Sequence, residues 1–300
     1  MSFMDDVKIS FGYAKKNMLS FLLAMFGMVI LVAIIVLIVM SPLLVVAWLT
    51  NPGDPEAFGL AIASYFQGFS GFMGTNPLVG FFAGGAIGLL FLIPIFAIGT
   101  WIYGGIYGMS HEIVLTGGTH AESAFGYLRK NLKSYLGAGV LWSLVLFVPL
   151  WLIGLGATAL TGFSSLPAGW GLPMAIVTFL YFYILGGFLM LHLPAATDGM
   201  SALDSLKASF RLTKENLGRV FGVWTIIVAI AVIFFLPIAV YAVYFSTPGV
   251  IDLIFGITIA WAAIGFFVLI LFVLPTMFLA FTRIYLSATG KLGQQENPAQ

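Results

Sequence analysis

Long stretches without a single charged residue constrain this chain more than any other feature. The runs that contain no Asp, Glu, Lys or Arg are 17–53, 57–111, 134–197, 220–251 and 253–282. An α-helix needs about 20 mostly apolar residues to cross the roughly 30 Å hydrocarbon core of a bilayer. The run 134–197 is long enough for two crossings, and a segment rich in Pro and Gly at 167–173 divides it.

The uncharged runs predict six membrane-spanning helices. Their predicted bounds are 18–46, 78–108, 134–162, 172–197, 219–246 and 252–284. Only 8% of the residues are charged, whereas a soluble globular chain carries about 25%. Polar side chains are therefore too few to cover a water-soluble domain of this size. The predicted fold class is an all-α integral membrane protein that forms a single membrane domain, 1–300.

The positively charged residues all lie on one side of the predicted spans. The 12 Lys and Arg fall in the segments 8–16, 129–133, 207–219 and 283–291. The opposite connections, 47–77, 163–171 and 247–251, contain none. Cytoplasmic loops of membrane proteins carry the excess of Lys and Arg. We therefore expect a multi-pass protein of the plasma (inner) membrane with its N- and C-termini in the cytoplasm.

The segments that precede three of the spans resemble one another. A shift of 199 residues brings seven identical residues into register, and in the first copy these are Ser2, Asp5, Lys8, Ser10, Phe11, Lys15 and Asn17. A shorter copy runs from Thr119 to Asn131. We expect three parallel repeats, each an amphipathic surface helix followed by a transmembrane hairpin. The repeat bounds are 1–115, 116–199 and 200–288, and a polar tail covers 289–300.

Each repeated segment has the pattern of a short helix at the membrane surface. Ser2, Thr119 and Ser201 each precede an acid by three residues, which is typical of a helix N-cap. Each segment ends in an asparagine, at 17, 131 and 216, whose side chain we expect to bond the backbone there.

Such helices lie with one face in the apolar layer and their basic residues at the lipid phosphates. The residues expected to contact lipid headgroups are Lys8, Lys15, Lys16, Arg129, Lys130, Lys133, Lys207, Arg211 and Lys214.

The third copy carries a family resemblance. A span that ends in Leu193-Pro194-Ala195-Ala196-Thr197-Asp198-Gly199 leads into Ala202-Leu203-x-Ser205-x-x-x-Ser209-Phe210-x-Leu212-Thr213-Lys214-x-Asn216. This pattern resembles the membrane domain associated with bacterial glycerophosphodiester phosphodiesterases, and related six-span proteins of bacteria and archaea. The resemblance implies a six-helix architecture. The phosphodiesterase chemistry of that family belongs to a separate soluble barrel domain, so no catalytic residue is carried over.

A few ionisable residues lie near the cytoplasmic ends of the predicted spans. Burial of such residues in hydrocarbon is costly, which makes them the default candidates for a functional site. They are His111, Glu112, His192, Asp198 and Arg283. We expect them to form a polar cluster in which Arg283 pairs with Glu112 or Asp198. A proton, ion or substrate site built from the same residues is the alternative.

No pattern of catalytic residues emerges from the sequence. His111-Glu112 begins like a zinc-protease helix, but Leu115 stands where the second histidine ligand is required. The chain has no cysteine, which excludes thiol catalysis and thiolate metal sites. The sequence therefore predicts no catalytic residues, no metal and no cofactor.

Glycines at four-residue spacing let helix backbones approach closely. Gly80, Gly84 and Gly88 have this spacing in the second span. We expect them to form a helix-packing ridge within the chain.

These features favour a non-catalytic membrane protein that serves as an accessory module at the cytoplasmic leaflet. Its expected partners are membrane lipids, with another membrane protein as a further candidate, and no nucleic acid. A transporter or channel for a small or apolar solute is the alternative, with a cavity between the hairpins. A membrane-embedded enzyme is the third hypothesis.

Overall fold

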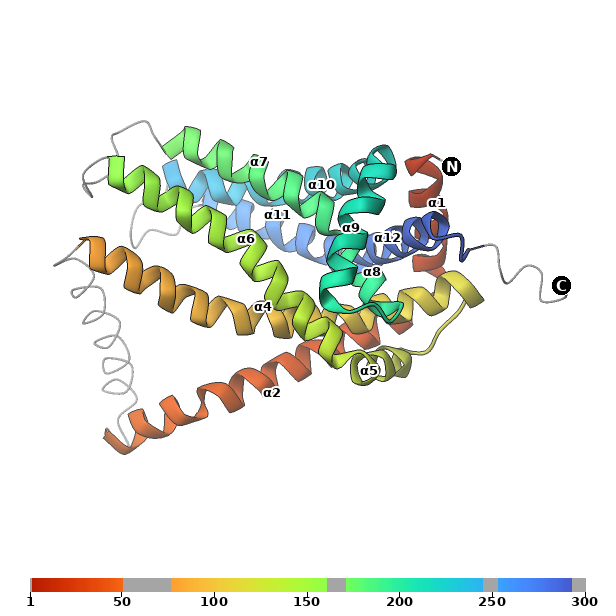
Figure 1. Ribbon diagram of the computed structural model, residues 1–300, viewed down its shortest axis with the longest axis horizontal. Helices are drawn as coiled ribbons and strands as arrows, with labels where there is room; N and C mark the ends of the chain where they lie inside the picture. The colour runs from red at the N-terminus through yellow and green to blue at the C-terminus, as the bar shows by residue number, and fades with distance from the viewer. Residues whose placement is uncertain (1, 51–76, 161–170, 245–252, 293–300) are drawn as a thin grey trace, which may run out of the picture. The chain divides into compact units, whose positions relative to one another are not determined.

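A computed structural model describes residues 2–50, 77–160, 171–244 and 253–292. These residues form helices and short connections, with no strand among them (Figure 1). Of the outer connections expected at 47–77, 163–171 and 247–251, the residues 51–76, 163–170 and 247–251 lie outside the described residues, as does the end of the polar tail.

Within the described ranges, six helices are long and apolar enough to cross a membrane, as predicted. The first three are α2 (Met18–Thr50), α4 (Pro77–Thr116) and α6 (Leu132–Leu160). The fourth consists of α7 (Gly171–Leu189) and α8 (His192–Thr197). The fifth is α10 (Leu217–Tyr244), and the sixth joins α11 (Leu253–Val268), η1 (Leu269–Val273) and α12 (Leu274–Ala288).

Proline explains two irregularities in these long helices. Pro194 has no N–H to offer the carbonyl of Met190, and the fourth span is interrupted at Met190 and Leu191 between α7 and α8. Pro275 likewise cannot bond the carbonyl of Leu271. The chain widens into the π-helical turn η1 just before it, where the N–H of Leu274 bonds the carbonyl of Leu269.

Three short helices precede spans where the repeated segments lie. They are α1 (Phe3–Lys16), α5 (Ala121–Lys130) and α9 (Ala202–Glu215), and each ends at the predicted asparagine. The amides of Asn17 and Asn216 donate to the carbonyls of Tyr13 and Leu212, at 3.0 Å in both cases. Asn131 donates instead to the carbonyl of Thr197, 3.3 Å away. The expected side-chain bond to the local backbone is therefore present at Asn17 and Asn216, whereas Asn131 bonds a carbonyl of α8.

The helix beginnings match the expectation in two of the three segments. Ser2 forms a full capping box with Asp5, and the Ser201 hydroxyl accepts a bond from the backbone N–H of Asp204. The expected cap at Thr119 is wrong. Helix α5 begins after His120, which makes no side-chain cap, because the Thr119 hydroxyl donates to Glu112 Oε2 at 3.0 Å.

The chain folds into two compact units. The first comprises Met1–Ala24, Gly99–Ala138 and Tyr183–Gln300, and the second comprises Met25–Ile98 and Gly139–Phe182. The first unit contains all three short helices, and its largest buried side chains include Tyr135, Tyr285, Phe21, Phe278 and Phe281. In the second unit, aromatic residues connect the helices: Phe96 packs edge-on against Phe147, with ring centroids 4.8 Å apart.

Close packing at glycine occurs at positions other than the expected Gly88. A Cβ on Gly88 would meet nothing within 4 Å, so this residue is not a packing position. The side-chain surroundings of Gly80 and Gly84 lie outside the described residues. The neighbouring Gly85 is the packed one, because a Cβ there would lie 1.9 Å from the indole of Trp151.

A second glycine pair lies further along α4, in the first unit. A Cβ on Gly104 would lie 2.5 Å from the ring of Tyr135, and one on Gly108 would lie 2.1 Å from that of Tyr127. These two glycines, four residues apart, let α4 approach α5 and the start of α6.

We predict that Gly108→Ala destabilises the protein by about 1–3 kcal/mol, the usual cost of forcing an extra methyl into a packed interface. Gly88→Ala is the matched control, since its methyl enters open space, and its effect should stay below about 0.5 kcal/mol. Denaturant titration in mixed micelles measures both. Equal effects of the two substitutions would contradict the close approach at Gly108.

Candidate functional site

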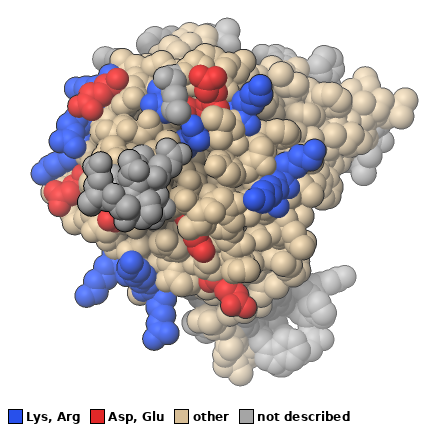
Figure 2. Space-filling model, turned by 90° about the vertical axis from the view of Figure 1, so that its right-hand side faces the viewer, with Lys and Arg blue, Asp and Glu red and all other residues tan. Residues whose placement is uncertain are grey.

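The three short helices gather at one end of the first unit, which we call the charged end. All nine basic residues expected at the lipid headgroups are exposed there. Figure 2 shows Lys and Arg side chains spread over this face, with Asp and Glu among them. The basic residues that are not exposed, Arg219 and Arg283, have a different role.

Asp6 is the centre of a buried ion-pair network at the charged end. Its side chain has no solvent exposure. Arg219 donates two hydrogen bonds to the carboxylate, from Nε to Oδ2 at 2.8 Å and from Nη2 to Oδ1 at 3.0 Å. Arg283 Nε lies 3.4 Å from Oδ1. Asp6 therefore connects α1 with α10 and α12.

The expected pairing of Arg283 with Glu112 or Asp198 is corrected by this geometry. Among the described residues, the carboxylate within ion-pair distance of Arg283 is that of Asp6. From the sequence, Asp5 is the only acid of α1 expected to have a role, in the helix cap. Asp5 does serve the cap, but Asp6 lies on the buried face, in line with Ser10 and Ala14.

The register of that buried face is shared by α9. The residues at the corresponding positions, Ser205, Ser209 and Thr213, are also buried. Small residues allow both helices to lie close against the spans. Asp6 is the only acid among these positions in the two helices, and it faces two arginines.

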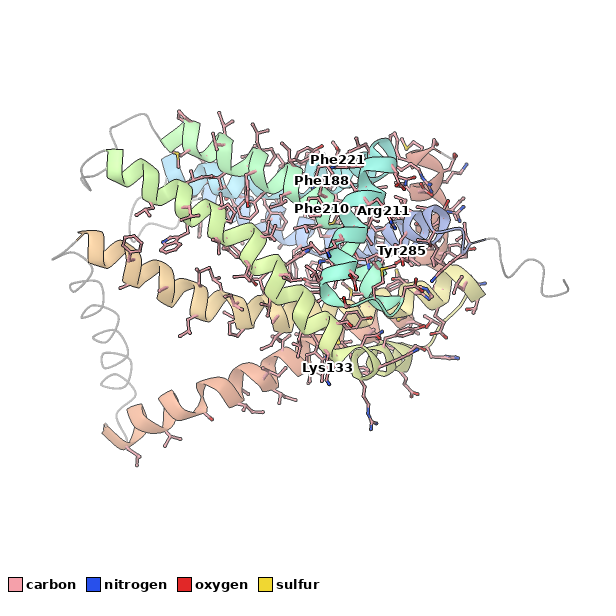
Figure 3. All side chains as sticks on the ribbon, viewed as in Figure 1. Lys133, Phe188, Phe210, Arg211, Phe221 and Tyr285 are labelled. Carbon is pink, nitrogen blue, oxygen red and sulfur yellow. The ribbon has the colours of Figure 1, made fainter. Side chains whose placement is uncertain are left out.

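Aromatic contacts fix α9. Phe210 stacks on Phe188 of α7, with ring centroids 5.4 Å apart, and Phe188 meets Phe221 of α10 edge-on at 5.6 Å (Figure 3). The Ser209 hydroxyl donates to the carbonyl of Phe188 at 2.6 Å. Phe210 thus has the apolar surroundings expected for it.

Asp198 forms a second polar centre in the same unit. It accepts a hydrogen bond from the Tyr285 hydroxyl at 2.8 Å, and it forms an ion pair with Lys291. His111 Nε2 lies 4.0 Å from its other oxygen. Arg283 and Tyr285 are two residues apart on α12, and side chains at that spacing point to opposite sides of a helix. Helix α12 therefore separates the Asp198 centre from the Asp6 centre.

The five predicted residues consequently do not form one cluster. His111 and Asp198 come together, whereas Glu112 accepts its hydrogen bond from Thr119. His192 is buried, and its Nε2 bonds the carbonyl of Ala202 at 3.1 Å. Arg283 belongs to the Asp6 network.

Two groups on the short helices have shifted pKa values. Hydrogen bonds from the backbone and hydroxyl of Ser2 hold the pKa of Asp5 below its ordinary value of 3.8. Partial burial raises the pKa of Tyr127, and the nearby Glu112 carboxylate adds to this rise. Both shifts favour the protonation states these groups already have near neutral pH.

Sequence reasoning missed four residues of these centres: Asp6, Arg219, Tyr285 and Lys291. The repeat contains a signal for Asp6. The aligned residue in the third copy is the uncharged Ser205, so an acid at this position departs from the repeat. Among the described residues, no three His, Asp or Glu side chains are arranged to hold a metal ion.

The chain has no counterpart among the proteins compared with it. No protein-family model matches it, and no curated protein and no solved structure matches it either.

We predict that Asp6→Ala lowers the free energy of unfolding by about 3–5 kcal/mol, because it leaves buried guanidinium groups without their carboxylate. Asp5→Ala is the matched control one residue away, and the loss of its capping contact should cost about 1 kcal/mol. Combining Asp6→Ala with Arg219→Ala should cost much less than the sum of the single losses. Additive losses would contradict the ion pair.

Proposed function

We propose that this protein is a non-catalytic accessory module that binds anionic phospholipid headgroups at the cytoplasmic leaflet through its charged end. The observation that carries the proposal is that nine basic residues of three short helices and their junctions are exposed at one end of one unit. A face of this kind beside apolar spans suits a membrane surface.

The charge balance of the charged end supports an anionic ligand. On the three short helices, the exposed acids are Asp5, Glu122, Asp204 and Glu215. Eight exposed bases on these helices, together with Lys133 just after α5, against these four acids leave an excess of five positive charges. Each Lys or Arg near an anionic leaflet contributes about 1 kcal/mol of attraction. The burial of Asp6 and the pairing of Asp198 keep two further acids from opposing this attraction.

Exposed apolar side chains beside these bases support a position at the interface. Phe11 on α1, Phe125 on α5 and Leu203 on α9 are 46%, 43% and 51% exposed. Helices that lie in the membrane interface place such residues among the acyl chains and their bases at the phosphates. Each short helix therefore offers both kinds of contact.

The proposed arrangement extends the repeat seen in the sequence. Three parallel repeats, each a surface helix and a transmembrane hairpin, would bring three equivalent basic helices to the inner leaflet of the plasma membrane. The Lys and Arg distribution supports cytoplasmic termini. The resemblance to the membrane domain of glycerophosphodiester phosphodiesterases implies the six-helix architecture that this arrangement needs.

We predict that the protein in nanodiscs enriches phosphatidylglycerol over phosphatidylcholine among the lipids it retains, as measured by native mass spectrometry. Neutralising α9 with Lys207→Gln, Arg211→Gln and Lys214→Gln should reduce this enrichment severalfold, since about 1 kcal/mol is lost per charge. The matched control exchanges the same residues with retention of charge: Lys207→Arg, Arg211→Lys and Lys214→Arg. Unchanged enrichment in the neutral variant would refute the proposal.

A further inference from the structure

An apolar groove lies between α1, α10 and the π-helical turn of the last span. Its volume is about 180 Å³. One face of α10 forms its floor, with Val223, Ile227 and Ile230 following one another at helical spacing. Phe272 and Val273 of η1 form one wall, and Phe11 of α1 lies at its lining as well. All of these residues belong to the first unit.

The π-helical turn shapes the groove. Turns of this kind inside α-helices are frequent at functional sites. Here the turn displaces Phe272 and Val273 from regular helical positions just before Pro275. Thr276 brings the one hydroxyl of the lining, and that hydroxyl is bonded to the carbonyl of Phe272 at 2.6 Å. The groove therefore presents apolar atoms to its occupant.

The size of the groove fits a slender chain. Val223 and Ile230 are seven residues apart, or about 10 Å along the helix axis. This length is about a third of the hydrocarbon core. A helix with its side chains is about 10 Å across, which is too thick for a groove of 180 Å³.

Positive charge lies beside the groove, on α1. Phe11 has Lys8 three residues before it and Lys15 four residues after it, so both lie on the same side of α1. Both lysines are exposed. Asp6 holds α1 in this position through Arg219 of α10, the helix that forms the groove floor.

We infer that the groove binds one acyl chain of an anionic phospholipid whose phosphate is held by Lys8 and Lys15. This inference rests on the proposed function and assigns it a defined lipid site. The apolar lining takes the chain, and the two lysines select the charged headgroup over a zwitterionic one.

The test uses the full chain in phosphatidylcholine vesicles that contain phosphatidylglycerol with a photoreactive diazirine on one acyl chain. Cross-links in the wild type should concentrate in the peptides of α10 and of residues 269–277. Ile227→Trp fills the groove and should reduce them severalfold. Ile233→Trp is the matched control on the same helix, at a side chain that is 58% exposed and outside the groove. It should leave the cross-links unchanged.

A second arm tests the headgroup. Lys8→Gln with Lys15→Gln should reduce cross-linking of the phosphatidylglycerol probe but not that of a phosphatidylcholine probe. Excess inorganic phosphate should not compete, because the acyl chain is part of the ligand. If Ile227→Trp disturbs folding, as judged by its thermal unfolding, the smaller change Ile230→Phe replaces it.

Equal cross-linking in Ile227→Trp and Ile233→Trp would overturn the inference, and so would wild-type cross-links that are no more frequent in the peptides of α10 and of residues 269–277 than in the other spans. Either result leaves the proposed function intact if the α9 variants still alter phosphatidylglycerol enrichment. The opposite outcome is that the α9 variants do not alter phosphatidylglycerol enrichment, while the groove still cross-links phosphatidylglycerol selectively. That outcome would refute the role of α9 and leave the lipid site in the groove standing.

Discussion

The position of α1 depends on one buried carboxylate. Asp6 has no solvent exposure and lies between Arg219 of α10 and Arg283 of α12. A buried charge is costly unless it is paired and hydrogen-bonded, so α1 has a strong reason to hold this one position. From it, Val7 and Phe11 face the apolar groove, and Lys8 and Lys15 remain exposed. The proposed lipid site is thus a consequence of the ion pair.

The other two short helices are held by different interactions. Helix α5 lies close to α4 because Gly108 leaves room for the side chain of Tyr127. Helix α9 is fixed by the stacking of Phe210 on Phe188 and by the hydroxyl of Ser209. Three different kinds of interaction therefore hold three similar basic helices at one end of the unit. Similar surfaces with different attachments are expected if the surface is what function requires.

The sequence predicts much of the fold and little of the polar site. The spans follow from uncharged runs, which depend only on local composition. The breaks at Asn17, Asn131 and Asn216 follow from a local repeat, and they occur where expected. The pairing of Asp6 with Arg219 joins residues 213 positions apart. No local pattern reports such a contact, since it depends on how helices cross. The packing predicted for Gly88 is wrong for the same reason. Its spacing suggests a helix contact, but among the described residues no neighbour lies within 4 Å of the position of its Cβ.

The depth of the short helices in a bilayer tests the central claim most directly. The chain has no cysteine, so single spin labels can be introduced at Phe11, Phe125 and Leu203 and at Lys15, Arg129 and Lys207. Electron paramagnetic resonance then compares collisions with oxygen, which concentrates in lipid, and with a water-soluble nickel chelate. The account predicts that the apolar positions favour oxygen and the basic positions favour the chelate, on all three helices. Chelate accessibility at the apolar positions equal to that at the basic ones would show that the charged end stands away from the membrane, and would contradict the account.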